Sequence, residues 1–155
     1  MTTKNLLVAV DFSEASNLVV DKARELAQQL TARIVLLHVM EPKAVPVPKR
    51  DSKGAIGAAW PLQTPKRLSG IKARLNSLAK PLKVLGIEVE SIAVAGLLLD
   101  EILDQAGKYR ADYIILGSHG HPAARHLATG NLTTGILSRL ACPLIIVPAK
   151  AGASQ

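Results

Sequence analysis

The sequence contains one cysteine, Cys142, and very few aromatic residues. A single cysteine excludes an internal disulfide and a cysteine-based zinc cluster, and its place between Ala141 and Pro143 favours a small buried side chain over a reactive thiol. Aromatic residues make up 3% of the chain, so the core has to be aliphatic. No apolar run is long enough to span a bilayer. No charged segment followed by an apolar stretch opens the chain, so we expect a cytoplasmic protein without membrane contact.

The charge balance is basic, with 19 basic and 12 acidic residues and a formal net charge of +7. Such a balance can indicate a nucleic acid or an acidic surface as partner. However, no run of five like charges occurs, and the aromatic side chains on which bases stack are nearly absent. We therefore favour a solvated basic exterior, and a nucleic-acid partner is not expected.

The length of 155 residues, 48% of them apolar, predicts a single domain over residues 1–150 and a flexible tail over residues 151–155. Short apolar runs alternate with helical stripes along this domain. Buried strands are expected at residues 6–10, 33–39, 112–117 and 144–147, and an edge strand with outward charges at residues 87–95. Helices are expected from Ser13 to Leu30, from Thr64 to Leu85, from Leu98 to Tyr109 and from about Asn131 to Leu140.

This alternation of strands and helices is typical of a parallel sheet with helices on both faces. Right-handed crossovers leave a few doubly wound orders of the strands. Ser13 is expected to cap the first helix. Pro81 should kink the second helix or end its regular part early, and Gly86 should stop it. The segment 41–63 has no clean period, and its Trp60 could anchor the segment, cover a ligand or meet another subunit.

Polar and glycine-rich segments follow two of the buried strands. Asp11, Phe12 and Ser13 follow the first strand, and the segment Gly117-Ser118-His119-Gly120 follows the strand at residues 112–117. In an open α/β sheet, ligands bind beyond the carboxyl ends of the strands, at the point where the winding reverses. If these two strands are neighbours, both segments border one crevice.

The second segment has the spacing Gly117-x2-Gly120-x9-Gly130. Glycine lets the backbone approach closely and adopt a positive φ, so amide groups can converge on an anion. Gly130 and Asn131 then begin a helix whose free N–H groups and dipole favour a phosphate, and Asn131, Thr133 and Thr134 add hydrogen-bonding side chains. Glycines can also merely shape turns. Three of them at a strand end and a helix start favour a phosphate cradle.

The cradle is neither a P-loop nor a dinucleotide fingerprint, because no G-x-x-x-x-G-K-[ST] occurs and no G-x-G-x-x-G follows a strand. Hydrolysis usually needs a positioned base and neutralisation of charge by Lys, Arg or a metal. Near the cradle the sequence offers Arg125 and histidines, with Asp11 as the candidate contact for a metal ion. We therefore expect binding with slow or absent turnover and assign no catalytic residue.

The histidines of the chain do not predict a metal site. His119, His121 and His126 are close in sequence, but they lack the i, i+4 spacing on a helix that a zinc protease uses. Solvent exposure or phosphate contact is the interpretation we favour for them. His38 lies in a buried strand and is expected to be a satisfied core residue.

Four segments carry a family resemblance: residues 8–13 (VAVDFS), 36–39 (LLHV), 115–120 (ILGSHG) and 142–147 (CPLIIV). Through them the chain resembles the universal stress protein family over nearly its whole length. ATP-binding members share G-x2-G-x9-G-[ST], and this chain has every glycine but Asn131 in place of the final Ser or Thr. An amide is bulkier than a hydroxyl, yet it still donates and caps a helix. The resemblance implies a doubly wound α/β fold: a five-stranded parallel sheet of order 3-2-1-4-5 with helices on both faces.

The resemblance also implies a role for each matching residue in binding ATP or AMP, with Mg²⁺ accompanying ATP. On the nucleoside side, Ala9, Val10 and Asp11 would line the ribose, the Val39 backbone would read adenine, and Leu116 and Gly117 would border the nucleoside. On the phosphate side, Gly120, Gly130, Asn131, Leu132 and Thr133 would hold the phosphates, and Ser118 and His119 complete the expected site.

The final strand, Leu144 to Val147, carries no charge, whereas Glu88 and Glu90 protect the other edge strand. An unprotected apolar edge invites pairing with another chain unless a loop covers it. We predict a two-fold homodimer through the last strand, as the resemblance also suggests. The expected function is an adenine-nucleotide-binding regulatory protein, and its role in stress responses comes from the resemblance alone. The alternatives are a slow ATPase or nucleotide hydrolase of the same fold, and a flavodoxin-like or receiver-type signalling domain.

Overall fold

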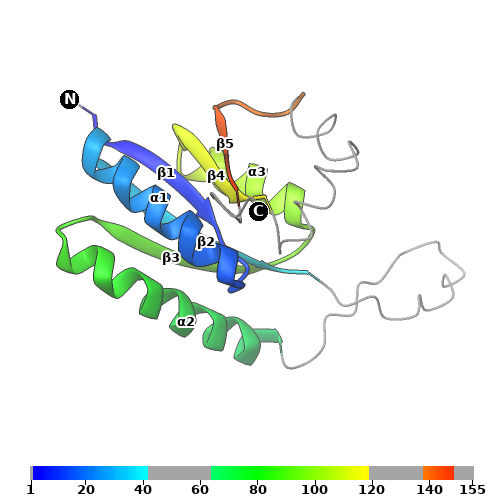
Figure 1. Ribbon diagram of the computed structural model, residues 1–155. Coiled ribbons are helices and arrows are strands. Elements are labelled where there is room, and N and C mark those ends of the chain that lie inside the picture. The colour runs from blue at the N-terminus through cyan, green and yellow to red at the C-terminus, as the bar shows by residue number, and fades with distance from the viewer. Residues whose placement is uncertain (1, 42–63, 119–137, 149–155) are drawn as a thin grey trace, which may run out of the picture.

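The computed structural model describes residues 2–41, 64–118 and 138–148, in which strands and helices alternate over most of the chain (Figure 1). The elements are β1 (Lys4–Ala9), α1 (Glu14–Leu30), β2 (Ala32–Met40), α2 (Thr64–Val84), β3 (Val89–Ala95), α3 (Leu98–Lys108), β4 (Tyr113–Gly117) and β5 (Leu144–Val147). The expected strands and the first three expected helices are all present, with most bounds shifted by one or two residues.

The strands of this part of the chain form one parallel sheet in the order β3-β2-β1-β4-β5. In the centre, β1 pairs with β2 on one side and with β4 on the other; Val8, for example, lies opposite Leu36 and Ile115. The chain therefore winds outward in one direction from β1 to β3 and in the other direction from β4 to β5. This confirms the expected doubly wound order and places the reversal at the carboxyl ends of β1 and β4.

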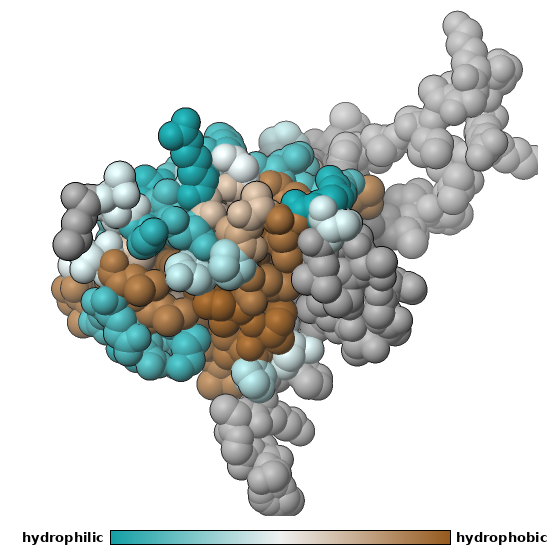
Figure 2. Space-filling view, turned by 90° about the horizontal axis from the view of Figure 1, so that it is seen from above, coloured by the Kyte–Doolittle hydropathy of each residue, from teal (hydrophilic) through white to brown (hydrophobic). Residues whose placement is uncertain are grey.

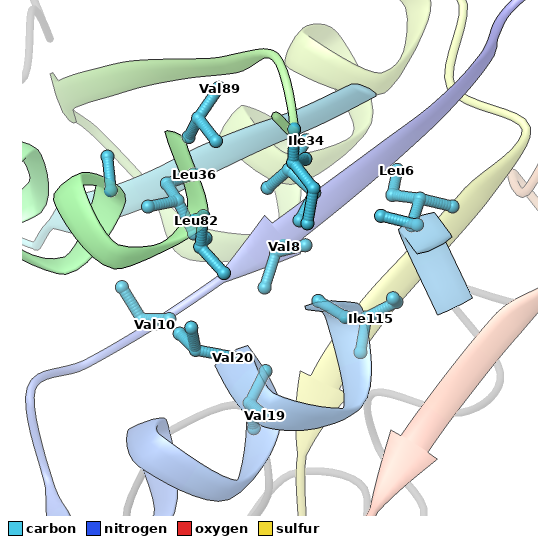
Figure 3. Packing of buried hydrophobic residues seen from close by; sticks show 14 of the residues in the cluster. Leu6, Val8, Val10, Val19, Val20, Ile34, Leu36, Leu82, Val89 and Ile115 are labelled. Carbon is cyan, nitrogen blue, oxygen red and sulfur yellow. The ribbon is translucent and has the colours of Figure 1, made fainter. Parts of the chain in front are cut away.

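One face of the sheet is covered by α1 and α2, and aliphatic side chains fill the space between them (Figure 3). Alternate residues of the central strands, such as Leu6, Val8, Ile34 and Leu36, point to this face and are fully buried. The helices contribute the facing side chains, which include Val19, Val20, Ala23, Leu75 and Leu82. Burying each large aliphatic side chain stabilises the fold by roughly 1.5–3 kcal/mol.

The other face of the sheet packs against α3. The intervening residues of the same strands, Leu7, Val35, Leu37 and Ile114, form this second cluster with Ile102 of the helix. Because both faces of the central strands are covered, these strands are continuous apolar runs and do not alternate. The edge strand β3 differs, since Glu88 just before it and Glu90 within it are exposed and both pair with Arg33 of β2. The edge expected for this strand is confirmed.

Pro81 does not end α2 early, because the helix continues to Val84. A proline deprives the carbonyl four residues before it of a donor. Here that carbonyl belongs to Ser77, and both residues are exposed, so water can satisfy it. Gly86 stops the chain's helical course as expected: its φ is +84°, and the N–H groups of Gly86 and Ile87 donate to the last carbonyls of the helix.

Several expectations fall partly or wholly outside the described residues. These are the loop segment with Trp60, most of the helix expected from about Asn131 to Leu140, and the tail over residues 151–155. Of that expected helix, Ser138 to Leu140 are described, and they form a turn and its end, not helix. In the part of the chain that is described, no helix has the length and apolar character needed to cross a bilayer.

Candidate functional site

The carboxyl end of β1 holds a carboxylate in a fixed position. Asp11 Oδ1 accepts hydrogen bonds from the Ser13 N–H (2.9 Å), the Ser13 hydroxyl (2.6 Å) and the Ser16 hydroxyl (2.9 Å). The Ser16 oxygen in turn accepts from the Asp11 N–H at 3.2 Å. Ser16 is buried and the other two residues are half-buried, so these bonds are partly shielded from water. The turn that follows β1 is thereby organised around the Asp11 side chain.

Ser13 does not cap α1 with its side chain. It occupies the N-cap position with an extended backbone, but its hydroxyl makes no capping bond to the helix. A cap requires the hydroxyl oxygen to accept from an N–H group of the helix, whereas here the hydroxyl is oriented by the bond that it donates to the Asp11 carboxylate. The expected cap is therefore wrong in its chemistry, and Ser13 is instead a support for Asp11.

Phe12 adopts a left-handed backbone conformation with a φ of +64°, which is uncommon for a bulky residue. Its ring lies 4.8 Å from the His38 ring, and the Arg74 guanidinium lies 4.0 Å from the Phe12 ring centroid. His38 Nδ1 lies 2.7 Å from the Val10 carbonyl oxygen, which can only accept, so Nδ1 carries the proton. The turn after β1 is thus joined to β2 and to α2 by stacked side chains and one hydrogen bond.

The end of β4 lies beside the end of β1, because these two strands are paired. Gly117 is the last residue of β4 and is buried, and the Ser118 N–H donates to the Val147 carbonyl oxygen at 2.9 Å. Leu116 and Ala9 are also buried, and both side chains belong to the cluster on the α3 face. The structure therefore brings the Asp11 turn and the start of the glycine-rich segment together at the carboxyl ends of β1 and β4.

Val39 lies past the end of β1, where β2 continues alone on that side. The last backbone hydrogen bond from β1 to β2 runs from the Val10 N–H to the Leu37 carbonyl, at 2.9 Å. On the opposite side, the Met40 carbonyl accepts from the Gly96 N–H. Since backbone groups alternate in direction along a strand, the Val39 N–H and carbonyl point toward the side of β1, beyond its last residue.

The remaining residues of the expected cradle lie outside the described part of the chain. They are His119, Gly120, Gly130, Asn131, Leu132 and Thr133. His121 and His126 lie there as well. Within residues 2–41, 64–118 and 138–148, no three His, Cys, Asp or Glu side chains are close enough to hold a metal ion.

With this geometry in place, comparison with known proteins decides the family. The model of the universal stress protein family matches residues 2–148. The chain belongs to the universal stress protein family. Among curated relatives, the universal stress protein MJ0577 of Methanocaldococcus jannaschii is 24% identical over 157 residues, which covers 95% of this chain and 96% of the relative.

Solved structures of universal stress proteins share the fold. The structure of MJ0577 has a TM-score of 0.69 at 21% identity and covers 99% of this chain and 100% of the other. A universal stress protein in complex with cAMP has a TM-score of 0.65 at 18% identity, covering 97% and 100% of the two chains. A universal stress protein from Archaeoglobus fulgidus in complex with dAMP has a TM-score of 0.58 at 17% identity, covering 94% and 98%.

The structure of this universal stress protein adds residues to the site that sequence reasoning did not single out. Ser16 holds the Asp11 carboxylate, and the Glu41 carboxylate accepts from the Leu98 N–H at 3.2 Å, which ties the end of β2 to the start of α3. The spacing of five residues between Asp11 and Ser16 is only a weak sequence signal for the contact between them. Nothing local predicts the second, because 57 residues separate its partners.

Proposed function

We propose that this universal stress protein binds an adenine nucleotide, AMP or ATP, across the carboxyl ends of β1 and β4. The observation that carries the proposal is the pairing of these strands, which brings Asp11 beside Gly117 and Ser118 at the reversal of the winding. Ser118 leads directly into the segment that contains Gly120 and Gly130, so phosphates held by that segment would lie within reach of the Asp11 turn.

Asp11 has the chemistry of a ribose ligand. A carboxylate accepts hydrogen bonds, and ribose hydroxyls donate them. Because Ser13 and Ser16 already fix the carboxylate, little side-chain entropy is lost when a ligand binds to it. The Val39 N–H and carbonyl, which point past the end of β1, are a donor and an acceptor of the kind that an adenine edge requires.

Relatives of the same fold support an adenine ligand. One universal stress protein was solved with cAMP and another with dAMP. The two ligands share the adenine ring and a single phosphate, and each lacks one free ribose hydroxyl. An adenosine monophosphate is therefore the smallest ligand that we expect to bind, and ATP with Mg²⁺ at Asp11 is the larger candidate.

We propose that the nucleotide is held without rapid turnover, and that the chain is a regulatory protein of stress responses. The cradle has no P-loop lysine, and Arg125 with the neighbouring histidines supplies the only basic side chains within the segment 117–134. Backbone amides and a helix N-terminus bind a phosphate without activating a nucleophile. A slow ATPase or nucleotide hydrolase of the same fold is the alternative.

We also propose a homodimer through β5. This strand pairs only with β4 in the described sheet, Ile146 is 40% exposed, and Leu144 and Ile145 are partly exposed. Figure 2 looks onto the side of the molecule on which β5 lies and shows a band of apolar atoms there. An apolar edge strand without charges is a surface that a second copy can cover.

The test is a calorimetric titration of the purified protein with AMP and with ATP. We expect saturable binding of one nucleotide per chain in the micromolar range, and a loss of at least tenfold in Gly130→Val, whose side chain would intrude on the phosphate. Gly107→Val is the matched control, because a Cβ at Gly107 in α3 meets nothing within 4 Å. Equal affinity in the wild type and in Gly130→Val contradicts the cradle, and steady release of phosphate from ATP favours the hydrolase.

A further inference from the structure

A concave site lies beside the Asp11 turn, on the side of the sheet that α1 and α2 cover. It is a cleft of about 480 Å³ between this turn, the end of β2 and the first half of α2. Phe12, Met40 and Ile71 give it apolar walls, and Arg67 and Arg74 border it from α2. Its volume falls in the range of small-molecule sites, about 300–1,000 Å³.

The cleft and the proposed nucleotide site face different sides of the sheet. Along β2, His38 follows the alternation of Ile34 and Leu36, which point toward α1 and α2, and His38 lines the cleft. Val39 and the buried Leu116 belong to the cluster on the α3 side. A ligand in the cleft would therefore contact the Asp11 turn from the side of α2. It would leave the carboxyl ends of β1 and β4 free for a nucleotide.

The charge at the cleft is unbalanced. Among the ion pairs of the described residues, none includes Arg67 or Arg74. Their helix, α2, contains Lys and Arg at six positions and no Asp or Glu. Asp11 also borders the cleft, and its single negative charge opposes the two arginines. The charged side chains that line the cleft therefore carry a net positive charge, which favours an anionic ligand.

Arg74 is placed so that it can bind an anion while it is held in position. Its guanidinium lies over the Phe12 ring, at 4.0 Å from the centroid. Stacking uses the flat face of a guanidinium, whereas its N–H donors lie in its plane and stay available for a carboxylate or phosphate. Arg67 lies seven residues earlier on the same helix, about 10 Å away along the axis at 1.5 Å per residue.

Gly70 keeps the cleft open between the two arginines. It lies inside α2, where glycine is unfavourable for a helix, and it lines the cleft. A Cβ added at Gly70 would meet nothing within 4 Å, so none of the described residues fills the space next to it. A large side chain at this position would occupy the cleft without disturbing the core.

We propose that this cleft is a second ligand site, for a small organic anion with an aromatic or other apolar body. The anionic group binds Arg67 and Arg74, and the body packs on Phe12, Met40 and Ile71. Mostly apolar walls with a small number of charged donors are the usual composition of small-molecule sites. The site is independent of the proposed nucleotide function, although both share the Asp11 turn.

The test uses anilinonaphthalene sulfonate, a fluorescent aromatic anion, titrated into the purified full chain. We expect saturable fluorescence with one dye per chain, at least tenfold weaker binding in Gly70→Leu, and several-fold weaker binding in Arg67→Ala. Lys72→Ala is the matched control, since Lys72 lies on α2 but does not line the cleft, and it should bind like the wild type. Gly70→Leu should melt at a higher temperature than the wild type, because leucine is the better helix former.

Equal dye binding in the wild type and in Gly70→Leu overturns the proposal, since the dye then binds elsewhere, for example on the apolar β5 edge. Equal losses in Arg67→Ala and Lys72→Ala overturn it as well, because they reveal a general effect of charge. AMP titrations of the same variants separate this proposal from the nucleotide site. Gly70→Leu should keep AMP binding, so a failure of AMP binding in every protein, wild type included, affects the proposed function alone.

Discussion

Replacing Ser16 by alanine should destabilise the fold and weaken nucleotide binding together. The Ser16 hydroxyl donates to Asp11 Oδ1 at 2.9 Å and accepts from the Asp11 N–H at 3.2 Å. Ser16 is 4% exposed, so water does not readily replace either bond in the folded protein. Alanine removes both bonds and leaves the volume of the side chain almost unchanged, which limits the effect to hydrogen bonding.

The magnitude follows from the kind of bond that is lost. A hydrogen bond to a charged group contributes about 1.5–3 kcal/mol, and a neutral one about 0.5–1.5 kcal/mol. Asp11 Oδ1 keeps its two bonds from Ser13, so the carboxylate is not left without a donor. We therefore expect the free energy of unfolding to fall by about 2 kcal/mol, at the lower end of the summed range of about 2–4.5 kcal/mol.

The assay is urea unfolding followed by far-ultraviolet circular dichroism, with AMP affinity measured on the same samples. Ser77→Ala is the matched control, because this exposed serine of α2 donates only to the Ala73 carbonyl, and its effect should stay within about 0.5 kcal/mol. A change in Ser16→Ala as small as in the control would refute the role of these bonds. A loss of stability with unchanged AMP affinity would refute their role in positioning Asp11.

Three further predictions concern the rest of the fold. Gly86→Ala should lower the free energy of unfolding by about 1 kcal/mol, because the φ of +84° at this position is unfavourable for alanine. Gly107→Ala in α3 should raise the free energy of unfolding by up to about 1 kcal/mol, because alanine is the better helix former and its Cβ meets nothing within 4 Å. Urea unfolding of both variants checks these opposite signs. Ile146→Lys on β5 should give a monomeric mass in analytical ultracentrifugation, and Val84→Lys, at an 85% exposed position of α2, should remain dimeric. Burial and the negative charge of Asp112 raise the pKa of the Cys142 thiol above its usual value, so iodoacetamide should react more slowly at pH 7.5 with the folded protein than with the urea-unfolded protein, and the rate should level off at a higher pH in the folded protein.

The strands could be predicted from the sequence because their burial leaves a direct mark on composition. Leu7 and Val8 are neighbours on β1 that point to opposite faces, and both are fully buried, so no polar residue interrupts the run. The exposed Glu88 and Glu90 mark the edge strand for the same reason. The order of the strands is different, since right-handed crossovers allow several orders and the resemblance to a family was needed to choose one.

The fine structure of the site could not be predicted, because it depends on contacts between distant segments. Glycine and asparagine are the residues expected at a positive φ. Phe12 nevertheless has a positive φ, and contacts of its ring with His38 and Arg74 accompany this conformation. Ser13 has the pattern of a helix cap, yet its hydroxyl is oriented by the bond that it donates to Asp11, and it accepts no bond from the helix. From the sequence, Pro81 is expected to break the helix. Because it is exposed and lies near the end of α2, the loss of one backbone hydrogen bond costs little stability.

The most direct test of the central claim is an amide chemical-shift map of the protein, recorded by nuclear magnetic resonance, as AMP is added. A nucleotide across the carboxyl ends of β1 and β4 should shift the amide signals of Asp11, Val39 and Ser118. The amide signals of Gly86, just after α2, and of Lys108, at the end of α3, should not move. Saturating shifts in the first set alone would support the account. Shifts confined to other parts of the chain, or none at millimolar AMP, would contradict it.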